Sequence, residues 1–249
     1  MLNHPVQHRP HSSFAVTPKS PSSLTDTLDT FTRTRWEAAL AGHQQSIRKG
    51  TTLASEGDQP AHLFVVLEGW MQKYRQLPDG RRQIVGFCLP GQVCDANLLT
   101  RLRLGHTLEA LESVRVAALD HDGLADILGQ CPALERALYR ADMIAANIER
   151  EWLVNIGARS ALERVAHLLC ELFVRQDPLL IGDEVRFPII QTELAEATGL
   201  TPVHVNRVLR DLRMEHGASA RNHKLRITNF AALAKLAGFR RDYLGFDDS

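Results

Sequence analysis

The hydrophobic positions of the chain first form short runs and later change to a helical period. From about Ile47 to Leu119, apolar and β-prone stretches such as residues 62–69 and 83–89 are interrupted by glycine and proline. Pro78-Asp79-Gly80 separates two of these stretches and has the composition of a tight turn, which predicts a β-hairpin. Many short strands punctuated in this way are typical of a sandwich or barrel of about 90 residues.

The second pattern begins at Pro132, which suits a first helical turn, and predicts one long helix over residues 132–157. Its apolar strip could form a seam between two copies of the helix, or it could pack on the helix's own domain. We favour a dimer helix, because the opposite face is charged and two alanines would allow close approach. The strip starts at Leu134, and the residues assigned to dimerisation are Leu138, Ala141, Ala145, Ile148 and Trp152.

Helical periodicity continues over residues 159–175, and a last compact unit follows a polar, proline-containing break. The first 30 residues are rich in Ser, Pro, Thr and His and contain no apolar run of signal-peptide length, which predicts a disordered tail. No stretch is apolar enough to span a membrane, so a cytoplasmic protein is expected. The expected divisions are a tail (1–30), a β domain (31–131), a dimer helix (132–157), a C-terminal domain (158–240) and a second tail (241–249).

Residues 191–213 carry the most information about function. Small and apolar residues would line the inner side of a short helix, which Gly199 would end in a left-handed conformation. Thr201 is a good N-cap, and Pro202 fits the first position of a second helix. Two helices joined by a short turn containing glycine are the helix-turn-helix signature, whose second helix enters the DNA major groove.

Positive charge is concentrated around this second helix. The chain has 29 basic and 29 acidic residues and therefore no net charge, yet residues 201–226 contain six basic side chains against two acidic ones. Such an excess fits neutralisation of DNA phosphates, and residues 219–228 suggest a wing hairpin around Asn222-His223. An ordinary helix corner with a solvated basic face is the alternative. The residues assigned to DNA contact are Thr192, Thr201, Val203, His204, Arg207, Arg210, Arg213 and Lys224.

This order of parts resembles the Crp/Fnr family of bacterial transcription regulators. Lys49-Gly50, residues 55–58 and Leu67-Glu68-Gly69 are similar to the glycine turns of its cyclic-nucleotide-binding-type jelly roll, and residues 200–207 to its recognition helix. Residues 151–172 are most similar to its FixK-like group. The resemblance implies an α+β fold with a β jelly roll, a long dimerisation helix and a C-terminal winged helix-turn-helix. It also implies a homodimer that binds an inverted repeat in double-stranded DNA and acts on RNA polymerase.

The resemblance also suggests roles for single residues of the second helix. Arg207 falls where the family uses an arginine on a guanine edge, and Arg210 falls where a basic residue meets a base or a phosphate. Val203 stands where many members carry a glutamate that accepts from cytosine. A valine could instead touch a thymine methyl group, so the half-site sequence is left open.

The predicted sensor departs from the family's cyclic AMP binders, which carry a Glu after Gly and an Arg–Ser pair further on. Here Gly91 is followed by Gln92 and Val93, and the later pair corresponds to His106-Thr107. A neutral histidine is a poor substitute for a guanidinium at an anion. We treat these five residues as the candidate effector pocket and expect no tight binding of cyclic AMP. Because no cysteine precedes Cys88, the iron–sulfur cluster of oxygen-sensing relatives is not expected either.

Other classes of function have weaker support. The four cysteines, at 88, 94, 131 and 170, lack CxxC spacing and are expected to be small buried apolar residues, with a redox role for one of them left open. His4, His8 and His11 lie in the predicted tail, so we expect no metal site. No catalytic triad or phosphate loop stands out, and an enzyme is not expected. The nearer alternative is a ligand- or protein-binding jelly-roll module with a degenerate wing that does not bind DNA.

Overall fold

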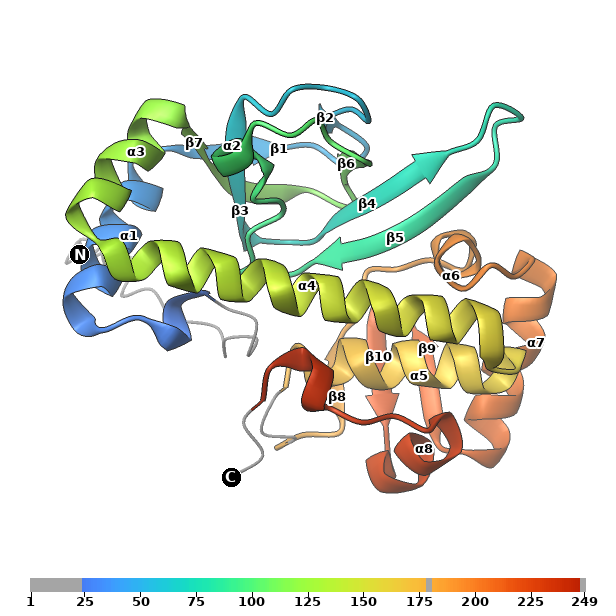
Figure 1. Cartoon of the computed structure of the whole chain (residues 1–249). Helices are drawn as coiled ribbons and strands as arrows, with labels where there is room; N and C mark the ends of the chain where they lie inside the picture. The colour runs from blue at the N-terminus through green and yellow to red at the C-terminus, as the bar shows by residue number, and fades with distance from the viewer. Residues whose placement is uncertain (1–23, 178–180, 247–249) are drawn as a thin grey trace, which may run out of the picture.

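The molecule consists of two lobes joined by one long helix. The computed structural model describes residues 24–177 and 181–246. Helix α4 (Pro132–Ala158) crosses the molecule from the N-terminal to the C-terminal lobe, and α5 (Ala161–Val174) lies beside its second half (Figure 1). A capping box starts α5, since Ser160 and Glu163 exchange side-chain and main-chain hydrogen bonds. In the described part of the chain, no helix has the length and apolarity needed to cross a membrane.

The N-terminal lobe is a sandwich of two antiparallel sheets, with strand orders β1-β7-β3 and β2-β6-β4-β5. Val66, Val116 and Leu108, which come from both sheets, share one buried cluster, so the two sheets pack face to face. This confirms the jelly-roll domain and the predicted hairpin. The strands are β1 (Gln44–Ile47), β2 (Thr52–Ala54), β3 (His62–Glu68), β4 (Met71–Gln76), β5 (Arg82–Cys88), β6 (Thr107–Ala110) and β7 (Val114–Asp120).

The connection from β3 to β4 requires the glycine that the sequence places there. Gly69 has a φ of +76°, and a Cβ at this position would lie 2.8 Å from the main-chain oxygen of Ser113. A larger residue would clash with the start of β7, the neighbour of β3 in its sheet, which explains the glycine of the Leu67-Glu68-Gly69 motif.

Short helices close one end of the sandwich, and they correct the predicted N-terminal tail. Leu24 and Leu28 are buried in one cluster with Trp36 and with Leu134 at the start of α4. The segment from Leu24 to residue 30 is therefore packed rather than free, while residues 1–23 lie outside the described part. The helices are η1 (Leu24–Thr27), α1 (Thr30–Ala41), α2 (Asn97–Thr100) and α3 (His121–Gln130).

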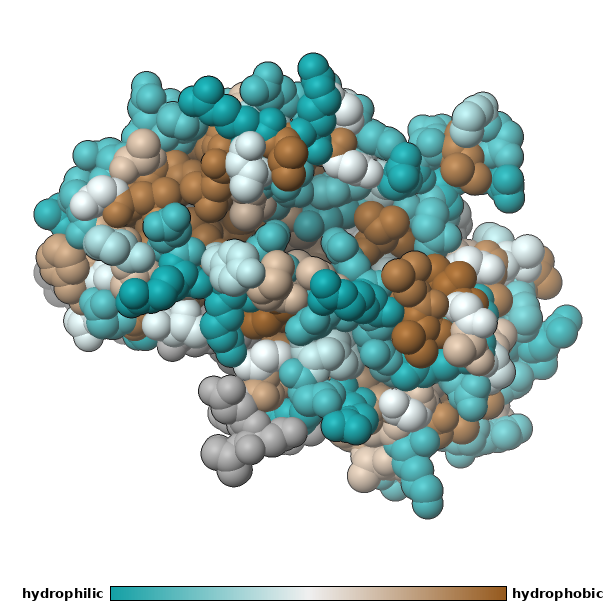
Figure 2. Space-filling model, viewed as in Figure 1, coloured by the Kyte–Doolittle hydropathy of each residue, from teal (hydrophilic) through white to brown (hydrophobic). Residues whose placement is uncertain are grey.

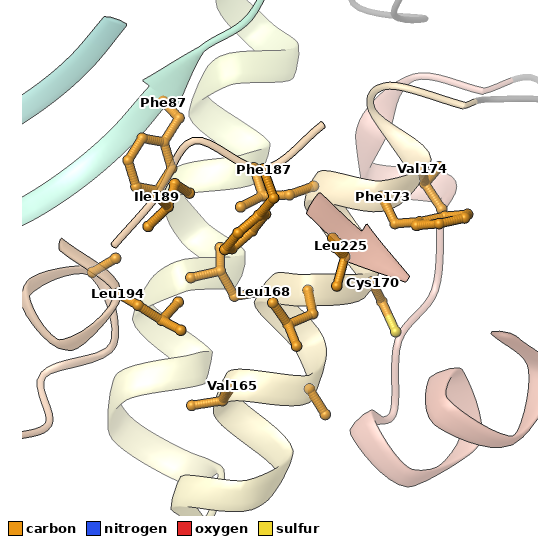
Figure 3. Close-up of a cluster of buried hydrophobic side chains, with 14 of the residues drawn as sticks. Phe87, Val165, Leu168, Cys170, Phe173, Val174, Phe187, Ile189, Leu194 and Leu225 are labelled. Carbon is orange, nitrogen blue, oxygen red and sulfur yellow. The ribbon is translucent and has the colours of Figure 1, made fainter. Parts of the chain in front are cut away.

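The C-terminal lobe packs a helix-turn-helix and a small sheet of order β8-β10-β9 onto α5. Figure 3 shows Phe87, from the end of β5, at one edge of this core beside Ile189. The hydrophobic core is thus continuous between the lobes. The elements are β8 (Glu184–Arg186), α6 (Gln191–Thr198), α7 (Pro202–Glu215), β9 (Ala218–Arg221), β10 (Lys224–Ile227), α8 (Phe230–Ala237) and η2 (Asp242–Leu244).

The strip of α4 that was assigned to the dimer packs inside its own chain. Leu138 is buried in the cluster of the N-terminal lobe, and Ile148 and Trp152 are buried in the cluster of the C-terminal lobe. Ala141 and Ala145 are half-buried on the same side, where they face a cavity against β5. Leu138, Ile148 and Trp152 thus pack as the alternative of a helix packed on its own domains expected, whereas Ala141 and Ala145 are only partly covered by their own chain.

The C-terminal segment that was predicted to be a tail is also packed as far as residue 246. Leu244 is buried, Tyr243 donates a hydrogen bond to Glu171 at 3.0 Å, and the main-chain oxygen of Gly245 accepts one from Arg140 at 2.8 Å. The apolar and aromatic side chains of this segment cover α4 and α5, which explains why it is fixed.

Candidate nucleic-acid interface

Helices α6 and α7 meet at the turn that the sequence predicted. Gly199 has a φ of +63° and ends α6, because its N–H reaches the Ala195 oxygen in a left-handed C-cap. The Thr201 hydroxyl accepts from the His204 N–H at 3.2 Å and starts α7. The two helices are also joined by a hydrogen bond from Asn206 to Gln191 at 3.2 Å. Val205, Val208 and Leu212 are buried, which fixes the side of α7 that faces outward.

The outward face of α7 presents most of the residues assigned to DNA contact. Thr201, His204 and Arg207 are exposed, and Val203 is 74% exposed. Within the described part of the chain, Arg207 has no ion-pair partner, whereas Arg210 lies 3.6 Å from the carboxylate of its neighbour Asp211. The face thus offers one uncommitted guanidinium beside an exposed apolar side chain.

Two other assigned residues lie at the margins of this face. Thr192 is exposed on the first turn of α6, and Arg213 is half-buried in the last turn of α7. Since a positive charge in the last turn of a helix also interacts favourably with the helix dipole, Arg213 has a structural role besides any contact with DNA.

The wing is a hairpin of β9 and β10, as predicted. Asn222 and His223 both have positive φ, 53° and 59°, which is the backbone of a tight two-residue hairpin turn. Ala218 is fully buried, so its small side chain serves the packing of the wing on α7. The hairpin therefore projects from the core beside α7.

The charge of the wing is lower than the sequence count suggested. Strand β8 pairs with β10 and brings two carboxylates to the wing: Lys224 lies 2.5 Å from Glu184, and Arg226 lies 2.8 Å from Asp183. The sequence pattern did not predict β8, since three residues are too few for a strand pattern. Among the basic side chains of residues 201–226, those without an acidic partner within 4 Å in the described part of the chain are thus Arg207 and Arg213 on α7 and Arg221 on the wing.

The five residues assigned to an effector pocket do not lie in one cavity. Gln92 and Val93 line a cavity between β5 and α4, whereas His106 lines a separate one with Asp58 and Asp95. Gly91 forms the tight turn before Gln92, and the Thr107 hydroxyl accepts from the Glu56 N–H at 3.1 Å. Gln92 and Val93 thus line one cavity and His106 another, and an effector pocket shared by the five residues stays a prediction.

Gln92 instead belongs to a buried polar network that joins the two lobes. The Arg175 guanidinium, at the end of α5, donates to the Gln92 Oε1 at 2.8 Å and to the main-chain oxygen of Phe87 at 2.6 Å. It also lies 3.1 Å from Glu171, which accepts from the Trp152 Nε1 at 3.0 Å. Burial raises the pKa of Glu171, although its cationic and hydrogen-bonding partners act in the opposite direction.

This network was not among the predictions, although the helical pattern contains a signal for it. Glu171 and Arg175 lie four residues apart on α5, and both are buried together with the apolar residues around them. Charged residues are almost never fully buried unless they are paired, so such a pair on the inner side of a helix marks an internal ion pair.

Comparison with known proteins agrees with this architecture. Residues 44–131 match the Cyclic nucleotide-binding domain, and residues 163–236 match the Crp-like helix-turn-helix domain. The chain is 34% identical to the Nitrogen fixation regulation protein FixK of Bradyrhizobium diazoefficiens, over 73% of this chain and 76% of that protein. It is 24% identical to the Fumarate and nitrate reduction regulatory protein of Escherichia coli, over 80% of each.

Among solved structures, FixK2 from Bradyrhizobium japonicum has the same fold, with a TM-score of 0.68 at 23% identity over 78% of this chain and 96% of that one. A jelly roll that a long helix connects to a winged helix-turn-helix defines a DNA-binding transcription regulator with a sensor-type domain. The chain belongs to the Crp/Fnr family of transcription regulators.

Proposed function

We propose that this regulator binds an inverted repeat as a homodimer, with α7 of each subunit in the major groove. The observation that carries this proposal is the outward face of α7, where Arg207 is exposed and has no ion-pair partner in the described part of the chain. The guanidinium of Arg207 reaches O6 and N7 of a guanine, and Val203 meets a thymine methyl group. Lys224 of the wing contacts the adjacent phosphates after it leaves Glu184.

The dimer contact is a second strip of α4, rotated by one residue from the strip that the sequence suggested. Tyr139 is 67% exposed and Leu153 is 71% exposed, and Met143 and Ala146 lie between them at spacings of four, three and seven. Figure 2 shows hydrophobic surface over the second half of α4. These spacings follow an a/d heptad, so two copies of α4 can pack along this strip. Regulators of this family act as homodimers.

Cyclic AMP does not suit either of the two cavities that the candidate effector residues line. The cavity beside Gln92 has about 50 Å³ of space for water-sized molecules, and ligand pockets typically have several hundred. The cavity at His106 is larger, about 220 Å³, but Asp58 and Asp95 line it and would repel a phosphate. Burial and the charge of Lys73 lower the pKa of His106 to about 3, so its ring is neutral at pH 7. We therefore propose that the protein does not bind cyclic AMP tightly; calorimetry that gives micromolar affinity would contradict this.

The two subunits, once bound to the inverted repeat, contact RNA polymerase and thereby regulate transcription. A module that binds a ligand or protein without DNA is the second candidate, and the ion pairs of Lys224 and Arg226 on the wing favour it. The free Arg207 on α7 favours DNA binding.

Selection from a random pool of duplex DNA, with the purified full chain and no added ligand, distinguishes these two candidates. Enrichment of an inverted repeat supports the regulator and shows that it needs no effector. If no motif is enriched even after addition of cell extract, DNA binding by this surface is contradicted and the second candidate is favoured.

A further inference from the structure

Two of the four cysteines lie at the ends of one short loop of the sensor domain. Cys88 is the last residue of β5, and the turn at Gly91 brings the chain back, with the Gln92 N–H donating to the Leu89 oxygen at 3.1 Å. At the other end of the loop, the main-chain N–H of Cys94 donates a hydrogen bond of 2.8 Å to the main-chain oxygen of Phe64. Both thiols are buried in the same cluster, and hydrogen bonding between them is the largest influence on the pKa of each.

The surroundings of the pair give its two thiols different acidities. The hydrogen bond from Cys94, followed by the positive charges of Lys73 and Arg175, lowers the pKa of Cys88 to about 7. The same hydrogen bond raises the pKa of Cys94, which stays a thiol. Burial lowers the pKa of Lys73, but Cys88 and Asp95 more than offset this, and the ammonium remains charged. These shifts favour Cys88 as the nucleophilic sulfur, and so does its place on the cavity between β5 and α4, which it lines.

A small oxidant can reach Cys88 although the residue is buried. Cys88 lines the cavity between β5 and α4, which has about 50 Å³ of space for molecules the size of water. Gln92, Glu149 and Arg175 also line this cavity and give it polar groups. Hydrogen peroxide is small and polar enough to enter such a space.

We propose that Cys88 and Cys94 are a modification site, at which hydrogen peroxide forms a reversible disulfide that weakens DNA binding. The Cys88 thiolate attacks one peroxide oxygen, so that an S–O bond forms, the O–O bond breaks and the leaving hydroxide takes up a proton to become water. The Cys94 sulfur then attacks the sulfenic acid, the S–S bond forms, and a second water leaves with the hydroxyl group and the Cys94 proton. The two thiols are oxidised and the peroxide is reduced.

The loop between the two cysteines connects this reaction to the DNA-binding lobe. Gln92 lies within the loop and Phe87 directly precedes it, and both provide acceptors for Arg175 of α5. A disulfide brings the sulfurs to about 2.05 Å, which shortens the loop and draws these acceptors away from the guanidinium. Arg175 then loses its hydrogen bonds to the sensor lobe, and the two lobes no longer keep the relative position that DNA binding requires.

The test uses the full chain in reduced form, treated with hydrogen peroxide and then with dithiothreitol. Peptide mapping without reduction should show a cross-link between Cys88 and Cys94 and the loss of two hydrogen atoms. Affinity for the selected duplex should fall roughly tenfold on oxidation and recover on reduction. Cys88→Ala and Cys94→Ala should each abolish the cross-link and the change in affinity. The buried cysteines Cys131 and Cys170 provide matched controls, since their alanine variants should behave like the wild type.

The DNA readout rests on the proposed function, while the mapping of the wild-type chain does not. Absence of the cross-link in the wild type overturns the proposal, and so does a cross-link that leaves the affinity unchanged. If the reduced chain binds no DNA, the proposed function fails, and the mapping still decides whether the disulfide forms.

Discussion

Arg175, the C-cap residue of α5, donates a hydrogen bond of 2.6 Å to the main-chain oxygen of Phe87 near the end of β5. These residues are 88 positions apart in the sequence and belong to different lobes. The same guanidinium is paired with Glu171 and bonded to Gln92, and both carboxylate and guanidinium are buried. The contact therefore fixes the DNA-binding lobe to the sensor lobe at one point.

Removal of Arg175 should destabilise the protein strongly. Arg175→Ala leaves the Glu171 carboxylate buried without its cation, and breaking a buried pair in this way costs about 3–5 kcal/mol. Urea unfolding of the single variant should show this loss. The double variant Arg175→Met with Glu171→Gln should recover much of it, because no buried charge is left. Equal stability of the single and double variants would contradict the role of the ion pair.

Arg207→Ala should weaken binding to the selected inverted repeat by about 1–3 kcal/mol per contact and relax the preference for guanine at the contacted position. Fluorescence anisotropy with the selected duplex and with single-base variants measures both effects. Arg81→Ala is a matched control, since Arg81 is exposed at the tip of the β4–β5 hairpin, where it pairs with Asp79. If both variants bind like the wild type, α7 is not the reading helix.

Leu153→Glu should convert the dimer to a monomer, because it places a charge in the apolar strip of α4. The side chain is 71% exposed within one chain, so folding should be unaffected. Sedimentation velocity measures the change in mass, and specific DNA binding should be lost together with the dimer. Leu77→Glu, at an exposed leucine after β4, is the control that should stay dimeric. A dimeric Leu153→Glu protein would exclude this strip.

Stability should fall as the pH is lowered from 7 to 5. Burial and the charge of Arg159 lower the pKa of His167 from 6.5 to about 3, so the unfolded chain binds a proton in this range that the folded chain does not. The contribution of His167 to the free energy of unfolding is therefore complete above pH 6.5 and decreases as the pH falls, by about 2 kcal/mol at pH 5. His167→Gln should reduce the pH dependence of the urea midpoint, whereas His204→Gln, at an exposed position, should leave it unchanged.

The sequence was sufficient to predict the elements whose signals are local. Gly199, Thr201 and Pro202 define the turn of the helix-turn-helix through their backbone preferences, and the structure has that turn. The hairpin of β4 and β5 follows in the same way from Pro78 to Gly80. The jelly roll was recognised from its glycine turns together with the order of the parts.

Contacts between distant segments could not be predicted in this way. The apolar period of α4 identified a buried face correctly, but periodicity does not say what covers it, and Leu138 and Ile148 pack within their own chain. Likewise, the acidic partners of Lys224 and Arg226 are Glu184 in β8 and Asp183 just before it, some 40 residues earlier in the sequence. Gln92 was assigned to a pocket because its interaction with Arg175 has no signature in the local sequence.

The central claim is that two copies of α7 contact the bases of one DNA site together. A hydroxyl-radical footprint on the selected duplex tests this claim most directly. We expect two protected segments on one face of the duplex, with their centres one helical turn, roughly 34 Å, apart. Protection should disappear from both segments in Leu153→Glu at concentrations where the wild type is bound. A single protected segment, or protection by the monomeric variant equal to that of the wild type, would contradict the account.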